Sequence, residues 1–102
     1  MKKEKQMRPS AALQRKRRDV LSIVQRYKAM NPRVFGSVLQ GNDLEDSDLD
    51  LLVDVLPGAT LFDLGGLQEA LEEILGVPVD LVTPNDLPPK FRQRVLAQAQ
   101  PL

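Results

Sequence analysis

The stretch that decides the fold is Val34-Phe35-Gly36-Ser37, followed after a ten-residue loop by Asp48-Leu49-Asp50-Leu51-Leu52-Val53. The apolar run predicts a strand, and side chains two apart on a strand point to the same face, so Asp48 and Asp50 are expected side by side. Carboxylates this close repel one another unless a cation joins them. Because Mg²⁺ is usually held by one or two carboxylates plus substrate phosphates, the pattern indicates a metal–nucleotide site.

Two further features of this region bear on that interpretation. Gly36-Ser37 supplies a flexible backbone and a hydroxyl, and Ser37 is expected to open a brief helical turn whose amides point toward phosphate. Five carboxylates and no basic residue lie between Asp43 and Asp50. Alone, Gly-Ser is usually a turn, and an acidic loop is usually solvated. An EF-hand is excluded, because its Asp-x-Asp-x-Asp-Gly register and twelfth-position Glu do not occur.

Gly36-Ser37, the gap and Asp48-Leu49-Asp50 resemble the signature of the DNA polymerase beta-type nucleotidyltransferase superfamily. The short chain is most similar to the minimal nucleotidyltransferases (MNT), antitoxins usually paired with HEPN-domain toxins. The resemblance covers nearly the whole chain and includes Asp80, where the family carries a third carboxylate on a neighbouring strand. It implies an α/β (α+β) fold with a small mixed or antiparallel sheet and helices packed on one face.

The resemblance also implies an activity. A Mg²⁺-dependent enzyme of this family would transfer AMP from ATP to a tyrosine hydroxyl of a cognate HEPN ribonuclease toxin and so neutralise it. The residues implied as catalytic, and as ligands of two Mg²⁺ ions, are Asp48, Asp50 and Asp80. The residues implied to bind the nucleotide are Gly36, Ser37, Gln40 and Gly41. Whether Asp80 is a general base or only a metal ligand stays open.

One position departs from the family pattern. Family loops often read Gly-Ser-x-x-Arg-Gly, and this chain has Gln40 in place of the arginine. A glutamine can hydrogen-bond phosphate but cannot neutralise it, so nucleotide affinity suffers unless Arg33, Lys90, Arg92 or a partner's arginine substitutes. This leaves open an antitoxin that acts by direct binding and masking with little or no catalysis. A third hypothesis is a nucleotidyltransferase that acts on RNA ends, with the basic residues 15–18 contacting the RNA backbone. It is disfavoured because the sequence has no aromatic cluster for base stacking.

Composition narrows the chemistry. The 102-residue chain is 42% apolar and 27% charged, as in an ordinary single domain. It has no cysteine and no histidine, so any general base must be a carboxylate or a lysine. No apolar run approaches the ~18 residues of a membrane span and no secretory signal is evident, so we expect a cytoplasmic protein. Residues 1–33 hold eleven basic residues against two acids, and residues 34–102 hold three against twelve.

The chain is expected to contain a flexible basic segment over 1–9 and one nucleotidyltransferase domain over 10–102. We expect a helix over 10–29 that begins at Ser10 and ends at Asn31-Pro32, because Ser caps helices and the residue before proline avoids helical geometry. The expected strands are 33–35, 49–55 and 77–82. A helix capped by Thr60 and Asp63 should run to about residue 75, with Gly76 as a left-handed cap.

Two further expectations concern single side chains. Asp54 shares a strand face with Asp48 and Asp50, but it is expected to be a solvated strand-end residue and not a ligand. The last helix is expected from Lys90 to about Gln98, with Phe91 and Val95 facing inward.

Overall fold

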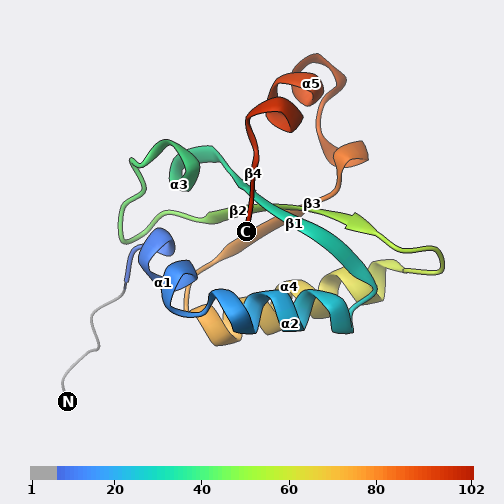
Figure 1. Ribbon diagram of the computed structural model, residues 1–102, viewed down its shortest axis with the longest axis horizontal. Helices are drawn as coiled ribbons and strands as arrows, with labels where there is room; N and C mark the ends of the chain where they lie inside the picture. Colours follow the sequence, from blue (N-terminus) through green and yellow to red (C-terminus); the bar gives the residue numbers. More distant parts are fainter. Residues whose placement is uncertain (1–6) are drawn as a thin grey trace.

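A four-stranded mixed sheet in the order β3-β2-β1-β4 forms the centre of the molecule (Figure 1). The computed structural model describes residues 7–102, so most of the expected flexible segment 1–9 lies outside the described residues. The strands are β1 (Ala29–Phe35), β2 (Leu49–Val55), β3 (Val79–Val82) and β4 (Gln100–Pro101). β1 runs antiparallel to β2 and β4, whereas β2 runs parallel to β3. The predicted α/β class with a small mixed sheet is confirmed.

The helices occupy both sides of this sheet. They are α1 (Pro9–Arg15), α2 (Arg17–Arg26), α3 (Gly36–Gln40), α4 (Leu61–Leu75) and α5 (Pro89–Gln98), with a short 3-10 turn η1 (Pro84–Asp86). α2 and α4 lie side by side below the sheet, and α3 and α5 lie above it in Figure 1. The expected packing of helices on one face therefore holds for the α2–α4 layer and not for α3 and α5. Among residues 7–102, no helix has the length and apolar character that crossing a bilayer requires.

The hydrophobic core lies between the sheet and the α2–α4 layer. On β2, Leu49, Leu51 and Val53 are fully buried in it, as the alternation of apolar residues predicted. Helices α2 and α4 supply the facing side chains, which are Val20, Ile23, Val24, Leu67, Leu71 and Leu75. The acidic side chains of β2 therefore point away from the core.

The N-terminal helix differs from the prediction in two ways. It is broken at Lys16, so α1 and α2 replace one continuous helix. The break falls within the run of four consecutive cations at 15–18. Ser10 is not the cap: α1 begins at Pro9, and the Ser10 amide donates a 2.9 Å hydrogen bond to the Asp43 carboxylate. A distant acid thus takes the capping role at the positive end of the helix.

The predicted helix stop at Asn31-Pro32 is wrong, because these residues lie inside β1. Helix α2 ends at Arg26, and Lys28 turns the chain with φ 60°. β1 then tolerates proline because the register with β2 is interrupted between Met30 and Arg33, with Asn31 in the left-handed region at φ 54°. The strand is therefore four residues longer at its start than the predicted 33–35.

Most predictions for the second half of the chain are confirmed, although β3 begins at Val79, two residues later than in the predicted strand 77–82. β2 matches the predicted range, and Thr60 and Asp63 form the expected capping box of α4. Gly76 ends α4 in the left-handed conformation. The last helix has the predicted extent within one residue. Of the two side chains expected to face inward, Val95 is half-buried, whereas Phe91 is 46% exposed.

Candidate functional site

Three aspartates lie near the start of the paired strands β2 and β3. The parallel register places Asp50 directly opposite Asp80. Asp48 lies immediately before β2 and is exposed. Leu49, Leu51 and Val79, which alternate with these acids, are buried in the core, so the acids point to the opposite face of the sheet. The predicted clustering of the three aspartates on one face is what the strand register produces.

The electrostatic environment of Asp50 is unfavourable for its charged form. Burial raises the pKa of Asp50 to about 6, and the negative charge of Asp80, a hydrogen bond with Asp80 and the charge of Asp48 act in the same direction. Among residues 7–102, the structure's ion pair joins Arg33 to Asp54, and no basic side chain pairs with these three acids. The site therefore lacks a protein cation where three negative charges gather, and a bound metal would relieve the repulsion.

The donor set fits a metal that arrives with its substrate better than a resident ion. Within the described part of the chain, no three acidic side chains converge into a preformed metal cage. Mg²⁺ seldom uses such cages: it keeps several waters and binds one or two carboxylates together with substrate phosphates. The facing pair Asp50 and Asp80, with Asp48 beside them, matches that mode of binding.

Gly36 allows the chain to pass close to the Asp50 carboxylate. Its φ of 74° is in the left-handed region, and a Cβ at this position would overlap Oδ2 of Asp50 and come within 3.0 Å of its Cγ. Only glycine therefore suits this position on both counts. Ser37 follows in the first turn of α3 and is half-buried. The predicted Gly-Ser element and the acid pair are thus brought together.

The other two predicted nucleotide-binding residues lie at the end of α3. Gln40 is its last residue and is exposed, and Gly41 ends the helix with φ 78°. The amides of Gly41 and Asn42 donate to backbone carbonyls of α3, including that of Ser37. The structure therefore gives Gly41 a clear conformational role, and Gln40 remains available at the surface.

The five acids of the loop do not act as one group. Asp43 is buried, and although burial raises its pKa, hydrogen bonds from Ser10 and its own amide, with the charge of Arg8, lower it overall. Glu45 and Asp46 are exposed and line a surface hollow together with Arg8. Only Asp48 and Asp50 of the original five thus join Asp80.

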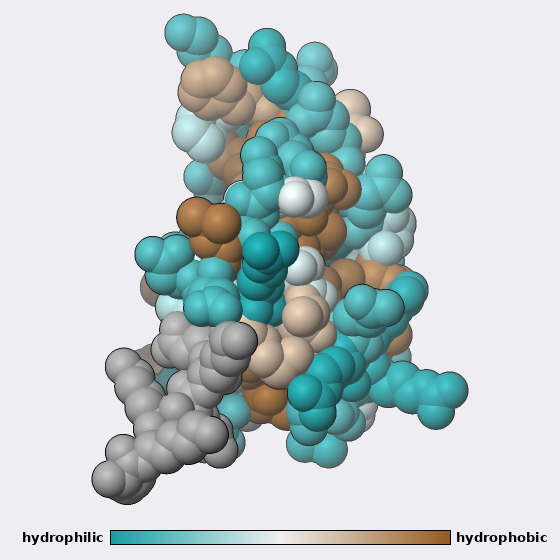
Figure 2. Space-filling model, turned by 90° about the vertical axis from the view of Figure 1, so that its left-hand side faces the viewer, coloured by the Kyte–Doolittle hydropathy of each residue, from teal (hydrophilic) through white to brown (hydrophobic). Residues whose placement is uncertain are grey.

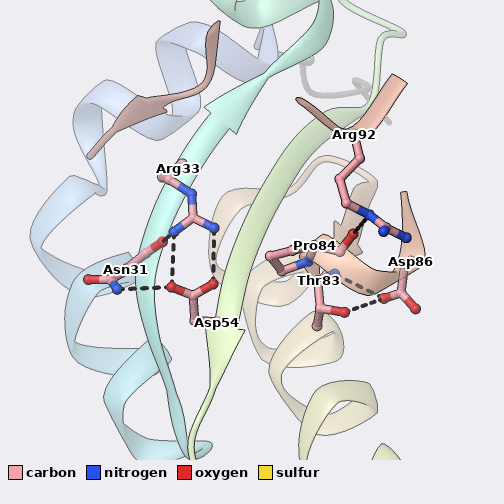
Figure 3. Close-up of polar contacts among 7 residues, drawn as sticks. All are labelled: Asn31, Arg33, Asp54, Thr83, Pro84, Asp86 and Arg92. Carbon is pink, nitrogen blue, oxygen red and sulfur yellow. Dashed lines mark hydrogen bonds and ion pairs between the residues drawn. The ribbon is translucent and has the colours of Figure 1, made fainter. Parts of the chain in front are cut away.

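Asp54, expected to be solvated, is instead held by an ion pair (Figure 3). Nη2 and Nη1 of Arg33 lie 3.1 and 3.2 Å from its two carboxylate oxygens, and Asn31 donates to it at 2.9 Å. Hydrogen bonds from Arg33 and then Asn31 lower the pKa of Asp54, against a smaller opposing effect of burial. The irregularity in β1 places both partners beside Asp54, and no local sequence signal indicates this. Arg33 is consequently engaged within the protein.

Arg92 is engaged as well, and sequence reasoning missed its role. Its Nε donates to the Pro84 carbonyl at 2.9 Å (Figure 3). Its Nη2 donates to the carbonyls of Leu87 at 3.1 Å and Asn85 at 3.4 Å. Because the acceptors are backbone carbonyls, which every sequence carries, no motif could have indicated these contacts. Of the three cations predicted to replace the loop arginine, Lys90 alone is exposed, with its Nζ 5.9 Å from the centre of the Phe91 ring.

Comparison with known proteins agrees with this geometry. The nucleotidyltransferase domain family matches residues 13–102. The protein adenylyltransferase MntA of Thermococcus cleftensis is 38% identical over 74 residues, which cover 72% of this chain and 75% of that protein. A solved structure described as a candidate minimal nucleotidyltransferase is 48% identical with a TM-score of 0.82, and the match covers 91% of this chain and 95% of that one.

A crystal structure of a toxin–antitoxin with AMP-PNP is 23% identical and has a TM-score of 0.69, over 82% of this chain and 69% of that one, which shows a shared fold. The family match spans the chain from α1 to its last residue and includes the Gly-Ser turn and both acidic strands. This chain therefore belongs to the nucleotidyltransferase domain family and is a nucleotidyltransferase of the minimal, polymerase beta-like type.

Proposed function

We propose that this chain is a Mg²⁺-dependent antitoxin that transfers AMP from ATP to a tyrosine hydroxyl of a cognate HEPN ribonuclease toxin and so neutralises it. The observation that carries the proposal is the strand register that sets Asp50 opposite Asp80, with Asp48 beside them and no basic partner among residues 7–102. The name of the Thermococcus cleftensis relative, a protein adenylyltransferase, supports AMP transfer to a protein. The shared fold with a toxin–antitoxin that was crystallised with AMP-PNP agrees with a toxin partner and a nucleotide substrate.

The three aspartates have distinct parts in this scheme. Asp48, Asp50 and Asp80 would hold two Mg²⁺ ions, which neutralise charge on the triphosphate and on the attacking and leaving oxygens when bound. Asp80 is proposed to accept the proton of the acceptor hydroxyl. The hydroxyl oxygen then bonds to the α-phosphorus of ATP, the bond from that phosphorus to the bridging oxygen breaks, and pyrophosphate leaves. AMP thereby becomes attached to the acceptor.

The Gly-Ser turn is proposed to hold the phosphate chain. Gly36 brings the backbone close to the Asp50 carboxylate, so a nucleotide bound through that carboxylate would lie within reach of the first turn of α3. Ser37 would donate its hydroxyl to a β- or γ-phosphate oxygen, with Gln40 and Gly41 completing the loop. Hydrogen bonds of this kind position a phosphate without neutralising it.

A second candidate is an antitoxin that masks its toxin by binding alone. The specific observation in its favour is the shortage of cations for phosphate. Gln40 replaces the family arginine, Arg33 is paired with Asp54, and Arg92 is bonded to backbone carbonyls. In the catalytic proposal, Lys90 or an arginine of the partner must supply the missing charge.

The deciding experiment is an intact-mass measurement of the toxin expected to be encoded beside this chain, after incubation with the chain, ATP and Mg²⁺. The test variant is Asp48→Asn/Asp50→Asn, and the matched control is Glu45→Gln/Asp46→Asn, which removes two exposed charges from the same loop. We expect mass gains in units of AMP with wild type and control and none with the test variant. An unchanged mass with wild type, while the test variant still neutralises the toxin, would establish masking and refute catalysis.

A further inference from the structure

Glu72 of α4 makes a hydrogen bond to the strand that carries Asp80. Its Oε2 accepts from the Val79 amide at 2.9 Å, and Val79 is the residue immediately before Asp80. The bond is partly buried, because Val79 is 3% exposed and Glu72 is half-buried. An ionised acceptor makes a stronger hydrogen bond than a neutral one. A charged side chain outside the three aspartates is thus bonded to the backbone that holds one of them.

The Val79 amide needs this acceptor because β3 lies at the edge of the sheet. In the described part of the chain, β2 is the one strand beside β3. The link from β2 to this point is the Leu49 amide, which donates to the Pro78 carbonyl at 2.9 Å, whereas the Val79 amide donates to α4. An edge strand leaves such outward amides without a partner strand, and a buried amide without an acceptor is costly. Glu72 therefore takes the place of a neighbouring strand.

Glu72 also ends the helix from which its side chain extends. Its backbone carbonyl accepts from the Gly76 amide at 2.8 Å, where α4 ends in the left-handed conformation. One residue thus accepts hydrogen bonds on both sides of the connection 77–78. Val77 is buried in the core, and Pro78 has a restricted φ, so this connection has little freedom of its own. The start of β3 is consequently fixed relative to α4 largely through Glu72.

Asp80 depends on this anchoring more than Asp50 does. Asp50 lies on β2, which has a paired strand on each side, whereas Asp80 is exposed on a four-residue edge strand. Figure 2 faces the end of the molecule where α4 ends and β2 and β3 begin, and hydrophilic residues cover much of that end. The hydrogen bonds from Leu49 to Pro78 and from Val79 to Glu72 flank the backbone just before Asp80.

We propose that Glu72 is a positioning residue that holds Asp80 in place opposite Asp50 for AMP transfer. It acts through the Val79 amide and not by contact with the substrate. The inference rests on the proposed function, in which Asp80 binds a metal ion and accepts the proton of the acceptor hydroxyl. A displacement of about 1 Å in a reacting group can lower a rate by about 100-fold, so a backbone shift at Val79 would be felt at Asp80.

Three single substitutions on α4 separate this role from general effects. Glu72→Ala removes the acceptor, whereas Glu72→Gln keeps an acceptor oxygen and removes only the charge. Glu73→Ala is the matched control, because Glu73 is the next residue of the same helix, is exposed, and loses the same charge and the same atoms. Alanine and glutamine both favour helices, so α4 itself should be retained in every variant.

The first measurement is the hydrogen exchange rate of the Val79 amide in the metal-free full chain, by NMR. Glu72→Ala should speed exchange by about tenfold or more, and Glu72→Gln and Glu73→Ala should stay within about threefold of wild type. The second measurement is steady-state AMP transfer to the toxin encoded beside this chain, normalised to the folded fraction by circular dichroism. Glu72→Ala should lower kcat by about 10–100-fold with an unchanged KM for ATP, and Glu72→Gln should restore most of kcat.

The outcomes separate this inference from the proposed function. Faster Val79 exchange with wild-type kcat would make the bond purely structural and overturn the inference. Reduced kcat with unchanged Val79 exchange, or an equal loss in Glu73→Ala, would overturn it as well.

If the wild-type chain transfers no AMP, the proposed function fails and the same variants are titrated with Mn²⁺. Binding is then followed through the paramagnetic broadening of the Asp50 and Asp80 amide signals. An affinity about tenfold weaker in Glu72→Ala alone would support positioning of Asp80. Equal affinities in all variants, or no broadening in wild type, would overturn it.

Discussion

Replacing Asp50 with asparagine is expected to stabilise the metal-free protein at neutral and alkaline pH. In the folded chain, burial and the neighbouring Asp80 and Asp48 raise the pKa of Asp50 from 3.8 to about 6. The folded state therefore binds this proton more tightly than the unfolded state, and the free energy of unfolding falls as pH rises from about 4 to 6. A pKa shift of this size corresponds to at most about 3 kcal/mol in the free energy of unfolding. Because Asp50 is partly exposed, we expect a smaller effect of about 1–2 kcal/mol.

The assay is urea unfolding of wild type and Asp50→Asn in EDTA, followed by circular dichroism across pH. The variant should be more stable by about 1–2 kcal/mol near pH 8, and the difference should shrink as pH falls and approach zero only well below the unfolded pKa of 3.8, where the wild-type carboxyl is protonated in both states. AMP transfer should be lost in the same variant. A variant that is no more stable than wild type near pH 8 would refute the view that repulsion among the three acids acts on the fold.

Asp54→Asn, on the same face of β2, is a control whose effect on the free energy of unfolding should have the opposite sign. Hydrogen bonds from Arg33 and Asn31 lower the pKa of Asp54, so its contribution is present above pH 3.8 and is lost as pH falls through its lower folded pKa. Because the Asp54 side chain is 36% exposed, we expect its substitution to lower the free energy of unfolding near pH 8 by only about 1 kcal/mol. Shifts of the same sign for both variants would contradict a charge-based explanation.

Three further substitutions test individual contacts. Gly36→Ala should lower the free energy of unfolding by about 1–3 kcal/mol and abolish AMP transfer, because its Cβ would overlap the Asp50 carboxylate in a left-handed backbone; wild-type values in thermal unfolding and transfer would contradict this. Asp43→Ala should lower stability by about 1–2 kcal/mol and speed hydrogen exchange of the Ser10 amide. An unchanged exchange rate would show that the loop does not cap α1. Arg92→Gln should lower stability by about 1–3 kcal/mol and leave MgATP affinity unchanged, whereas a drop in MgATP affinity would place Arg92 on the nucleotide.

The sequence predicts elements well where their signals are local. β2 follows from strict alternation, and α4 follows from a capping box at its start and a glycine at its end. Asn31-Pro32 is also a local signal, and its usual meaning as a helix stop is wrong here. What overrides it is non-local: β2 pairs on both sides of the irregularity, and Asp54 binds Asn31 and Arg33 from the neighbouring strand.

The same division applies to the candidate site. Alternation on two strands, which a sequence displays directly, predicts that Asp50 and Asp80 point to the same face of the sheet. The register that sets them opposite each other comes from the structure. Asp43 could not be sorted from its acidic neighbours, because its partner is an amide 33 residues away. The inward facing of Phe91 was wrong for a related reason. Periodicity identifies the apolar side of a helix, but it does not say whether the same chain covers that side.

The distribution of cations in this chain separates the residues that hold the fold together from those of the candidate site. Its engaged guanidinium groups serve the scaffold: Arg33 holds Asp54 across β1 and β2, and Arg92 holds the loop that leads into α5. Neither is left to neutralise the Asp50–Asp80 pair, so under the proposed function that pair keeps its repulsion until metal ions bind with the nucleotide. The arginines thus stabilise the fold, whereas the acidic pair is left for the proposed substrate binding. In the proposed mechanism, the acids at Asp50 and Asp80 carry an energetic penalty that a bound metal–nucleotide complex would relieve.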